Sequence, residues 1–201
     1  FTMHIMTKQS LYGKTLSQLK ALCEAEQLPR FAAKQIARWL YVRRVTDIQQ
    51  MTDLSLAART RLAERYELGL SAPLRESVST DGTKKYLFKT WQGEYIESAY
   101  IPDRDRATLC VSSQAGCRMG CKFCASTIGG RVRDLTPAEL VGQVIAAQKD
   151  ISANDPGARI GGIVMMGIGE PLDNYDNVLK FLRLVGHPDG LNIGYRHISL
   201  S

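Results

Sequence analysis

Apolar residues recur at helical spacing in the first third of the chain, from about residue 15 to residue 66. The first predicted helix ends before Pro29, because proline cannot continue a helix, and its inner face carries Leu16, Leu19, Leu22 and Cys23. A second helix is expected from Phe31, and a third over 55–66. These patterns predict a small helical domain over residues 1–70.

The second predicted helix also carries a basic stripe. Arg30, Lys34 and Arg38 repeat every four residues and therefore share one helix face. Such a stripe fits contact with RNA, but it equally fits a solvated helix face, and net charge does not separate the two.

Two β-rich runs follow the helices. Residues 84–90 and 95–101 are rich in aromatic and other strand-forming side chains, and Gln92-Gly93 provides a turn between them. We expect a β-hairpin connector over residues 71–102.

The pattern then changes to alternating strands and helices. Strands are predicted at 108–112, 163–166 and 196–201. A capping box at Thr136 to Glu139 begins one helix, and a second is expected over 176–185. Alternating β and α units predict an α/β fold, here the first half of a partial (β/α)6 barrel over residues 103–201. Three strands cannot close a barrel, so we expect the rest of this domain to lie outside the sequence.

Composition narrows the class of protein only moderately. The chain has 201 residues, 44% of them apolar and 23% charged, which is typical of a globular protein rather than a disordered one. Its net charge of +6 favours a polyanionic partner. No run is long enough for a membrane helix and no secretory signal is evident. Five cysteines, three of them within eight residues, are unlike a secreted disulfide framework, so we expect a reducing, cytoplasmic location.

Cysteine spacing is the most specific chemical signal. Three of the five cysteines, Cys117, Cys121 and Cys124, form a C-x3-C-x2-C loop that also contains Gly116 and Gly120. Three thiolates would hold a [4Fe–4S] cluster and leave one iron free to bind a small molecule. Structural zinc prefers four ligands in paired units, and no second pair is present. Unconnected buried thiols are the other alternative, although a polar loop that contains three cysteines is poorly suited to form part of a hydrophobic core.

The cysteine loop, with Phe123 before its last cysteine, resembles the signature of radical S-adenosylmethionine (SAM) enzymes. Two longer strings are more specific: residues 106–114, RATLCVSSQ, and residues 164–171, VMMGIGEP. Both resemble the RlmN/Cfr family of rRNA adenine methyltransferases. The resemblance extends over essentially the whole chain.

This resemblance implies roles for particular residues. Cys117, Cys121 and Cys124 would bind the cluster, while Gly169, Glu170 and Ser201 would contact SAM. Cys110 would act in catalysis and Glu97 would accept a proton from the substrate base. Without the resemblance, the Gly169-Glu170 segment reads as a turn with a solvated glutamate. Likewise, Cys110 reads as a packing residue, Glu97 as a surface residue and Ser201 as the end of a strand.

The resemblance also implies an activity. The family methylates an adenine of 23S rRNA, and its RlmN branch acts on carbon 2 and also on tRNA, by way of a methylated cysteine. No cysteine follows Cys124, so we expect that residue outside this sequence and expect this stretch alone to be inactive. Methylation at carbon 8, as in the Cfr branch, and a non-catalytic metal-bearing RNA-binding module are the alternatives. We further expect a monomer that receives electrons from a flavodoxin-like donor.

Overall fold

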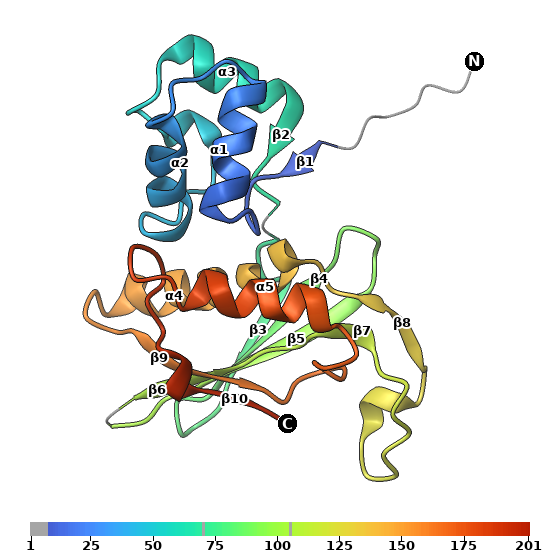
Figure 1. Ribbon diagram of the computed structural model, residues 1–201. Coiled ribbons are helices and arrows are strands. Elements are labelled where there is room, and N and C mark those ends of the chain that lie inside the picture. The colour runs from blue at the N-terminus through green and yellow to red at the C-terminus, as the bar shows by residue number, and fades with distance from the viewer. Residues whose placement is uncertain (1–7, 70, 105) are drawn as a thin grey trace.

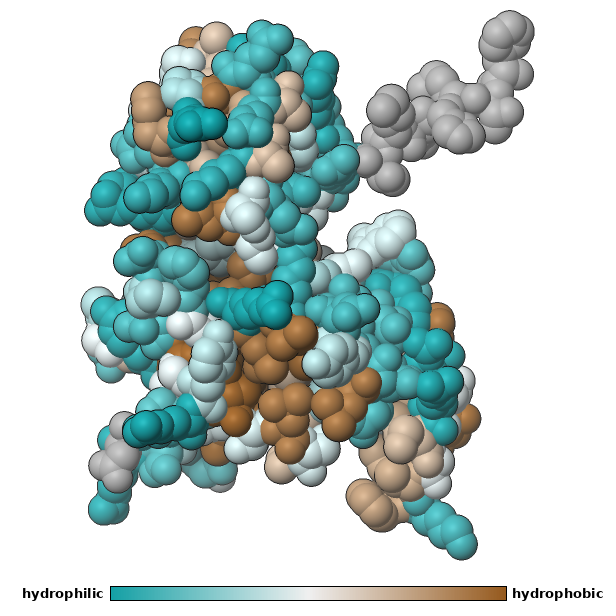
Figure 2. Space-filling view, in the orientation of Figure 1, coloured by the Kyte–Doolittle hydropathy of each residue, from teal (hydrophilic) through white to brown (hydrophobic). Residues whose placement is uncertain are grey.

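A computed structural model describes residues 8–69, 71–104 and 106–201. Figure 1 shows a helical unit stacked on a second part, in which two helices lie on a twisted sheet. In Figure 2, the visible face of the helical unit is mostly hydrophilic, whereas apolar residues gather on the part below it. No helix in the described ranges is long and apolar enough to cross a membrane.

The helical unit confirms the three predicted helices. They are α1 (Leu16–Ala25), α2 (Ala32–Tyr41) and α3 (Leu56–Arg65). Their inner faces form a dry core, in which the following side chains are fully buried: Leu19, Ile36, Leu40, Met51 and Leu62. Three short elements were not predicted: the parallel pair β1 (Gln9–Ser10) and β2 (Tyr66–Glu67), and the 3-10 helix η1 (Ile48–Gln50).

The second part is organised by a six-stranded sheet with the order β10-β9-β6-β5-β4-β3. Its strands are β3 (Arg75–Val78), β4 (Lys84–Lys89), β5 (Tyr95–Ile101), β6 (Ala107–Cys110), β9 (Ile160–Met165) and β10 (Ile198–Leu200). Strands β6, β9 and β10 are parallel, and the remaining pairs are antiparallel. The fold is therefore mixed α/β.

The predicted hairpin exists as β4 and β5, but it continues the central sheet. The short link after β5 allows it to pair with β6, with Ala99 opposite Cys110. Strand β3 extends the same sheet and escaped prediction because all four of its residues are exposed, so it lacks apolar alternation. The hairpin is thus part of the sheet, while the domain boundaries at 70 and 102 stay predictions.

Two helices cover one side of the sheet (Figure 1): α4 (Pro137–Asn154) and α5 (Tyr175–Val185). The predicted capping box is present at the start of α4, where Thr136 N donates to Glu139 Oε2 at 2.9 Å. Buried side chains between helices and sheet include Leu140, Ile163 and Phe181. The opposite face of β6 is not covered in this way, since Thr108 and Cys110 stay half-buried.

A separate two-stranded sheet brackets the cysteine loop. It consists of β7 (Gln114–Gly116) and β8 (Arg131–Asp134), which pair antiparallel. Two single-turn 3-10 helices complete the described elements, η2 (Ala125–Thr127) inside the loop and η3 (Tyr195–His197) before β10. Strands β7 and β8 were not predicted, because runs of three and four residues are too short to show a clear period.

Gly13 of the helical unit packs directly against the start of α4. Its φ of +83° is disfavoured for residues with a side chain. A Cβ atom at this position would lie 2.6 Å from the backbone nitrogen of Ala138. The two parts of the chain can therefore pack this closely only with glycine at position 13.

We predict that Gly13→Ala lowers the free energy of unfolding by about 3 kcal/mol or more, since it adds a backbone clash to an unfavourable φ. Gly93→Ala is the matched control, because Gly93 also has a positive φ of +102° but no atom within 4 Å of an added Cβ. It should cost only about 1 kcal/mol. Urea denaturation of both variants measures the difference, and equal losses would contradict close packing at Gly13.

Candidate active site at the carboxyl ends of the parallel strands

The three parallel strands place the predicted site residues along one edge. Cys110 is the last residue of β6 and pairs with Val164 of β9, and Leu200 of β10 pairs with Met165. The Gly169-Glu170 segment follows β9, and Ser201 follows β10 directly. Loops at the carboxyl ends of parallel strands commonly form active sites. The fold thus brings Cys110, Gly169-Glu170 and Ser201 to the same edge of the sheet.

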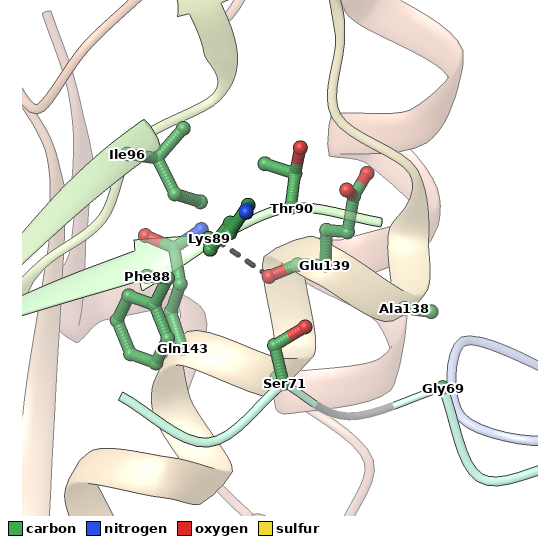
Figure 3. Close-up of a pocket in the computed structure, with 10 residues that line it drawn as sticks. Gly69, Ser71, Phe88, Lys89, Thr90, Ile96, Ala138, Glu139 and Gln143 are labelled. Carbon is green, nitrogen blue, oxygen red and sulfur yellow. Dashed lines mark hydrogen bonds between the residues drawn. The ribbon is translucent and has the colours of Figure 1, made fainter. Parts of the chain in front are cut away.

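The segments that leave β6 and β9 are bonded to each other. Ser113 N donates to Ile168 O at 2.8 Å, and Ile168 N donates to Ser112 Oγ at 2.9 Å. Helix α4 fixes the first segment, because buried Gln143 accepts a hydrogen bond from Ser112 N and donates one to Ser112 O, both at 2.9 Å. Figure 3 shows Gln143 beside Phe88 of the sheet. The edge is therefore a rigid surface.

The close packing of the segments that leave β6 and β9 requires a glycine at position 169. Its φ is +104°, and an added Cβ would lie 2.5 Å from Gln114 Cβ. The family resemblance implies only that Gly169 contacts SAM; the structure adds a tight contact with the neighbouring segment. Glu170 is half-buried beside it, and its carboxylate accepts a hydrogen bond from Leu172 N at 3.0 Å.

Gln114 connects the strand-end segments to the cysteine loop. It is fully buried, and its Oε1 accepts a hydrogen bond from Glu170 N at 2.9 Å. Its Nε2 donates to Asp134 Oδ1 at 2.8 Å and to Asp173 Oδ2 at 3.0 Å. Asp173 is also ion-paired with Arg118, which lies in the loop between Cys117 and Cys121. A single buried amide thus joins three segments.

Hydrogen bonds from Gln114 and then from Arg118 hold the pKa of Asp173 below its usual range. Asp173 therefore stays ionised at neutral pH and keeps its bond to the loop. Sequence reasoning missed both Gln114 and Asp173, because a polar residue inside an apolar stretch has no defined partner until the strands are placed.

The cysteine loop is closed at its base by backbone packing. Gly116 has a φ of +72°, and an added Cβ would lie 2.0 Å from Gly130 O. Cys117 N donates to the same oxygen at 3.1 Å. Glycine at position 116 is thus needed for the two ends of the loop to meet.

The three loop thiols differ in exposure. Cys117 is buried, Cys124 is half-buried and Cys121 is exposed, and all three are free. Hydrogen bonding to Ser126 lowers the pKa of Cys124, which favours the thiolate form that binds metals. Across 8–69, 71–104 and 106–201, however, no three His, Cys, Asp or Glu side chains converge so that they could hold a metal ion. The donor set fits an iron–sulfur cluster, but the side chains are not drawn together.

Glu97 and Cys110 lie on the same face of the sheet. Cys110 is opposite Ala99, and Glu97 is two residues from Ala99 on β5, so their side chains point the same way. Glu97 is exposed and ion-paired with Lys85 at 3.2 Å. Burial raises the pKa of Cys110, and a hydrogen bond from the Met166 amide lowers it in part. Both side chains lie on the face without helices.

Known proteins are similar to this chain over nearly its whole length. Residues 9–68 match the family model of the ribosomal RNA large subunit methyltransferase N-terminal domain. A probable dual-specificity RNA methyltransferase RlmN from Clostridium novyi is 45% identical over 194 residues, covering 96% of this chain and 55% of the relative. Its counterpart from Geobacillus kaustophilus is 45% identical over 192 residues, which is 96% of this chain and 52% of that protein.

A solved structure is similar over the same region. The crystal structure of a radical SAM methyltransferase from Sphaerobacter thermophilus superimposes with a TM-score of 0.89 at 40% identity, covering 96% of this chain and 56% of that one. The fold of this chain is therefore that of the corresponding part of a radical SAM methyltransferase. The chain belongs to the RlmN family, and it spans about half the length of the curated relatives it matches.

We predict that Gln114→Leu destabilises the site, because it removes one hydrogen bond from Asp134, one from Asp173 and the acceptor of the Glu170 amide. The loss should be roughly 1–3 kcal/mol, as is typical when a buried polar group is left without a partner, since both carboxylates keep an arginine partner. Hydrogen–deuterium exchange should accelerate at residues 131–135 and 167–174. The exposed turn residue Gln92, changed to leucine, should leave exchange there unaltered. Unchanged exchange in Gln114→Leu would contradict the role of this amide.

We also predict that Cys110 reacts slowly with iodoacetamide in the cluster-free chain. Its raised pKa keeps the thiol protonated at neutral pH, and only the thiolate reacts. The rate should therefore keep increasing above pH 9, whereas exposed Cys121 should react faster throughout. Peptide mapping by mass spectrometry separates the cysteines. A Cys110 rate that equals that of Cys121 at pH 8 would contradict the burial effect.

Proposed function

We propose that this chain supplies the cluster- and SAM-binding part of an enzyme that methylates carbon 2 of an adenine in 23S rRNA and in tRNA. One observation carries the proposal: the cysteine loop is bonded through Gln114 and Asp173 to the Gly169-Glu170 segment at the strand edge. A cluster on the loop and a cofactor on the edge would therefore be neighbours. The names of the relatives support the substrate class.

Cys117, Cys121 and Cys124 would hold a [4Fe–4S] cluster, with one iron left for SAM. When reduced, such a cluster provides the electron that cleaves SAM and generates a radical. The chain's own contribution is to anchor the loop: the Arg118–Asp173 ion pair and the closed base at Gly116 limit its movement.

Other residues would bind SAM and act on the base. The Glu170 carboxylate is suited to accept hydrogen bonds from the ammonium of SAM, and Ser201 ends the adjacent strand. Cys110 would serve as the thiol that resolves the bond between enzyme and RNA, and burial keeps it protonated until then. Glu97, on the same face, would accept the proton lost by the base.

The proposal also includes the barrel fold, the RNA contact of the helical domain, the cellular location, the oligomeric state and the electron donor. The parallel strands β6, β9 and β10, covered on one face, support the first half of a partial barrel. The helical domain over 1–70 would contact RNA, and the exposed Lys34 and Arg38 on α2 are available for this. We further propose a cytoplasmic monomer that uses a flavodoxin-like electron donor.

Anaerobic reconstitution with iron and sulfide tests the proposal. We expect about four irons per chain and an EPR spectrum of the reduced form that changes when SAM is added. Alanine at Cys117, Cys121 or Cys124 should abolish cluster binding, whereas Cys110→Ala and Cys23→Ala should retain the iron. Zinc in place of iron would contradict the proposal and favour a non-catalytic RNA-binding module.

A further inference from the structure

A groove separates the helical unit from the α4 and α5 layer. Its volume is about 460 Å³, and it extends from Lys8 and Lys14 on the helical unit to Trp91 and Lys180 on the second part. Figure 3 is a close-up of a separate, smaller pocket, which shares Gly69, Ala138 and Glu139 with the lining of this groove. The volume of the groove is in the range of pockets that hold small molecules and nucleotides.

Two lysines line opposite walls of the groove. Lys14 precedes α1, and Lys180 comes from α5. Burial lowers the pKa of both ammonium groups, and the charge of Lys14 lowers the pKa of Lys180 further. Within the described residues neither forms an ion pair with a carboxylate; Lys14 donates only to Gln9 Oε1, at 3.3 Å. Two partly desolvated cations that face each other favour an anion between them.

The acidic residues of the groove do not offset this charge. Glu139 is already paired with Arg133, at 2.7 Å, and caps α4 through Thr136. Glu67 is exposed on β2. Lys8 adds a third cation to the lining. The groove therefore retains an excess of positive charge.

Trp91 provides a flat apolar surface in the same groove. Its side chain is 66% exposed. The guanidinium of Arg133 lies 5.6 Å from the indole centroid, and Glu94 and Glu139 hold that guanidinium in place. An indole supported by a fixed cation and open to solvent is suited to stack on a nucleobase.

We propose that this groove binds a single-stranded segment of the RNA substrate, with Lys14 and Lys180 on one phosphate and Trp91 stacked on a base. The inference rests on the proposed function for the RNA itself, and it adds a contact on the helix side of the sheet, opposite the face that carries Cys110. A free phosphate would leave most of the 460 Å³ and the indole unused. The groove would increase RNA affinity without taking part in the chemistry.

Fluorescence anisotropy with a labelled single-stranded oligoribonucleotide tests the lysines. A plot of the logarithm of the RNA association constant against the logarithm of salt concentration has a negative slope. In Lys14→Gln/Lys180→Gln this slope should become shallower by about 0.7, the value for one lost phosphate contact on a single strand. Lys20→Gln/Lys149→Gln removes the same charge from exposed positions outside the groove and should leave the slope unchanged. Thermal unfolding of both double variants checks that they fold.

Trp91 is tested by affinity and by its own fluorescence. Trp91→Ala should weaken binding about 5- to 100-fold, as expected for one lost base stack. The chain has two tryptophans, and the other, Trp39, is only 7% exposed. RNA should therefore quench the emission of the wild-type chain, and Trp91→Phe should abolish the quenching while keeping most of the affinity.

Several results would contradict RNA binding in the groove but would leave the proposed function unaffected. These are equal affinity and salt slope in the groove variants and the control, a preference for duplex RNA, or no RNA binding by the wild-type chain. Cluster loading and its response to SAM are measured without RNA, so they report on the proposed function separately. Loss of the cluster with intact, groove-dependent RNA binding would contradict the proposed activity but support the groove.

Discussion

The hydrogen bonds between the segments that leave β6 and β9 are the constraint on which the candidate site depends. Residues in parallel strands share an edge, but loops beyond that edge are free to diverge unless something holds them. Here the backbone of Ser113 meets that of Ile168, and the buried amide of Gln114 extends the connection to Glu170 and Asp173. The cysteine loop is positioned through the same amide, since Asp173 binds Arg118.

The two faces of the sheet differ in how deeply their side chains are buried. The face under α4 and α5 is apolar and supplies most of the packing energy of this part of the chain, with side chains such as Leu109 and Ile163 fully buried. The other face carries Cys110 and Glu97, which are polar and only partly enclosed. A well-packed apolar layer behind this face would hold Cys110 and Glu97 in fixed positions, as the proposed function requires.

Local patterns predicted the elements well where one physical signal dominated. Helical periodicity placed α1, α2 and α3, and the capping box placed the start of α4. The strand predicted over 163–166 corresponds to β9, so Gly169 and Glu170 follow a strand as predicted, whereas Cys110, predicted inside a strand over 108–112, is the last residue of β6. The sequence did not reveal that β5 joins the central sheet, because strand pairing is a non-local property.

The polar network was not predictable for a related reason. Nothing in the sequence distinguishes Gln114, Asp134 and Asp173 from other polar residues. Their hydrogen-bond partners lie up to 59 positions away along the chain. Cysteine spacing indicated the ligands, whereas the convergence of their side chains is not present in the structure of the chain alone. Candidate ligands can thus be inferred from local spacing, but site geometry depends on the fold.

Calorimetric titration of SAM into the cluster-loaded and the iron-free chain tests the central claim most directly, namely that loop and strand edge form one site. The account predicts binding to the loaded chain, much weaker binding to the iron-free chain, and weakened binding to loaded Glu170→Gln with its iron content intact. Equal affinity of the loaded and iron-free chains would contradict it, because SAM would then bind away from the cysteine loop.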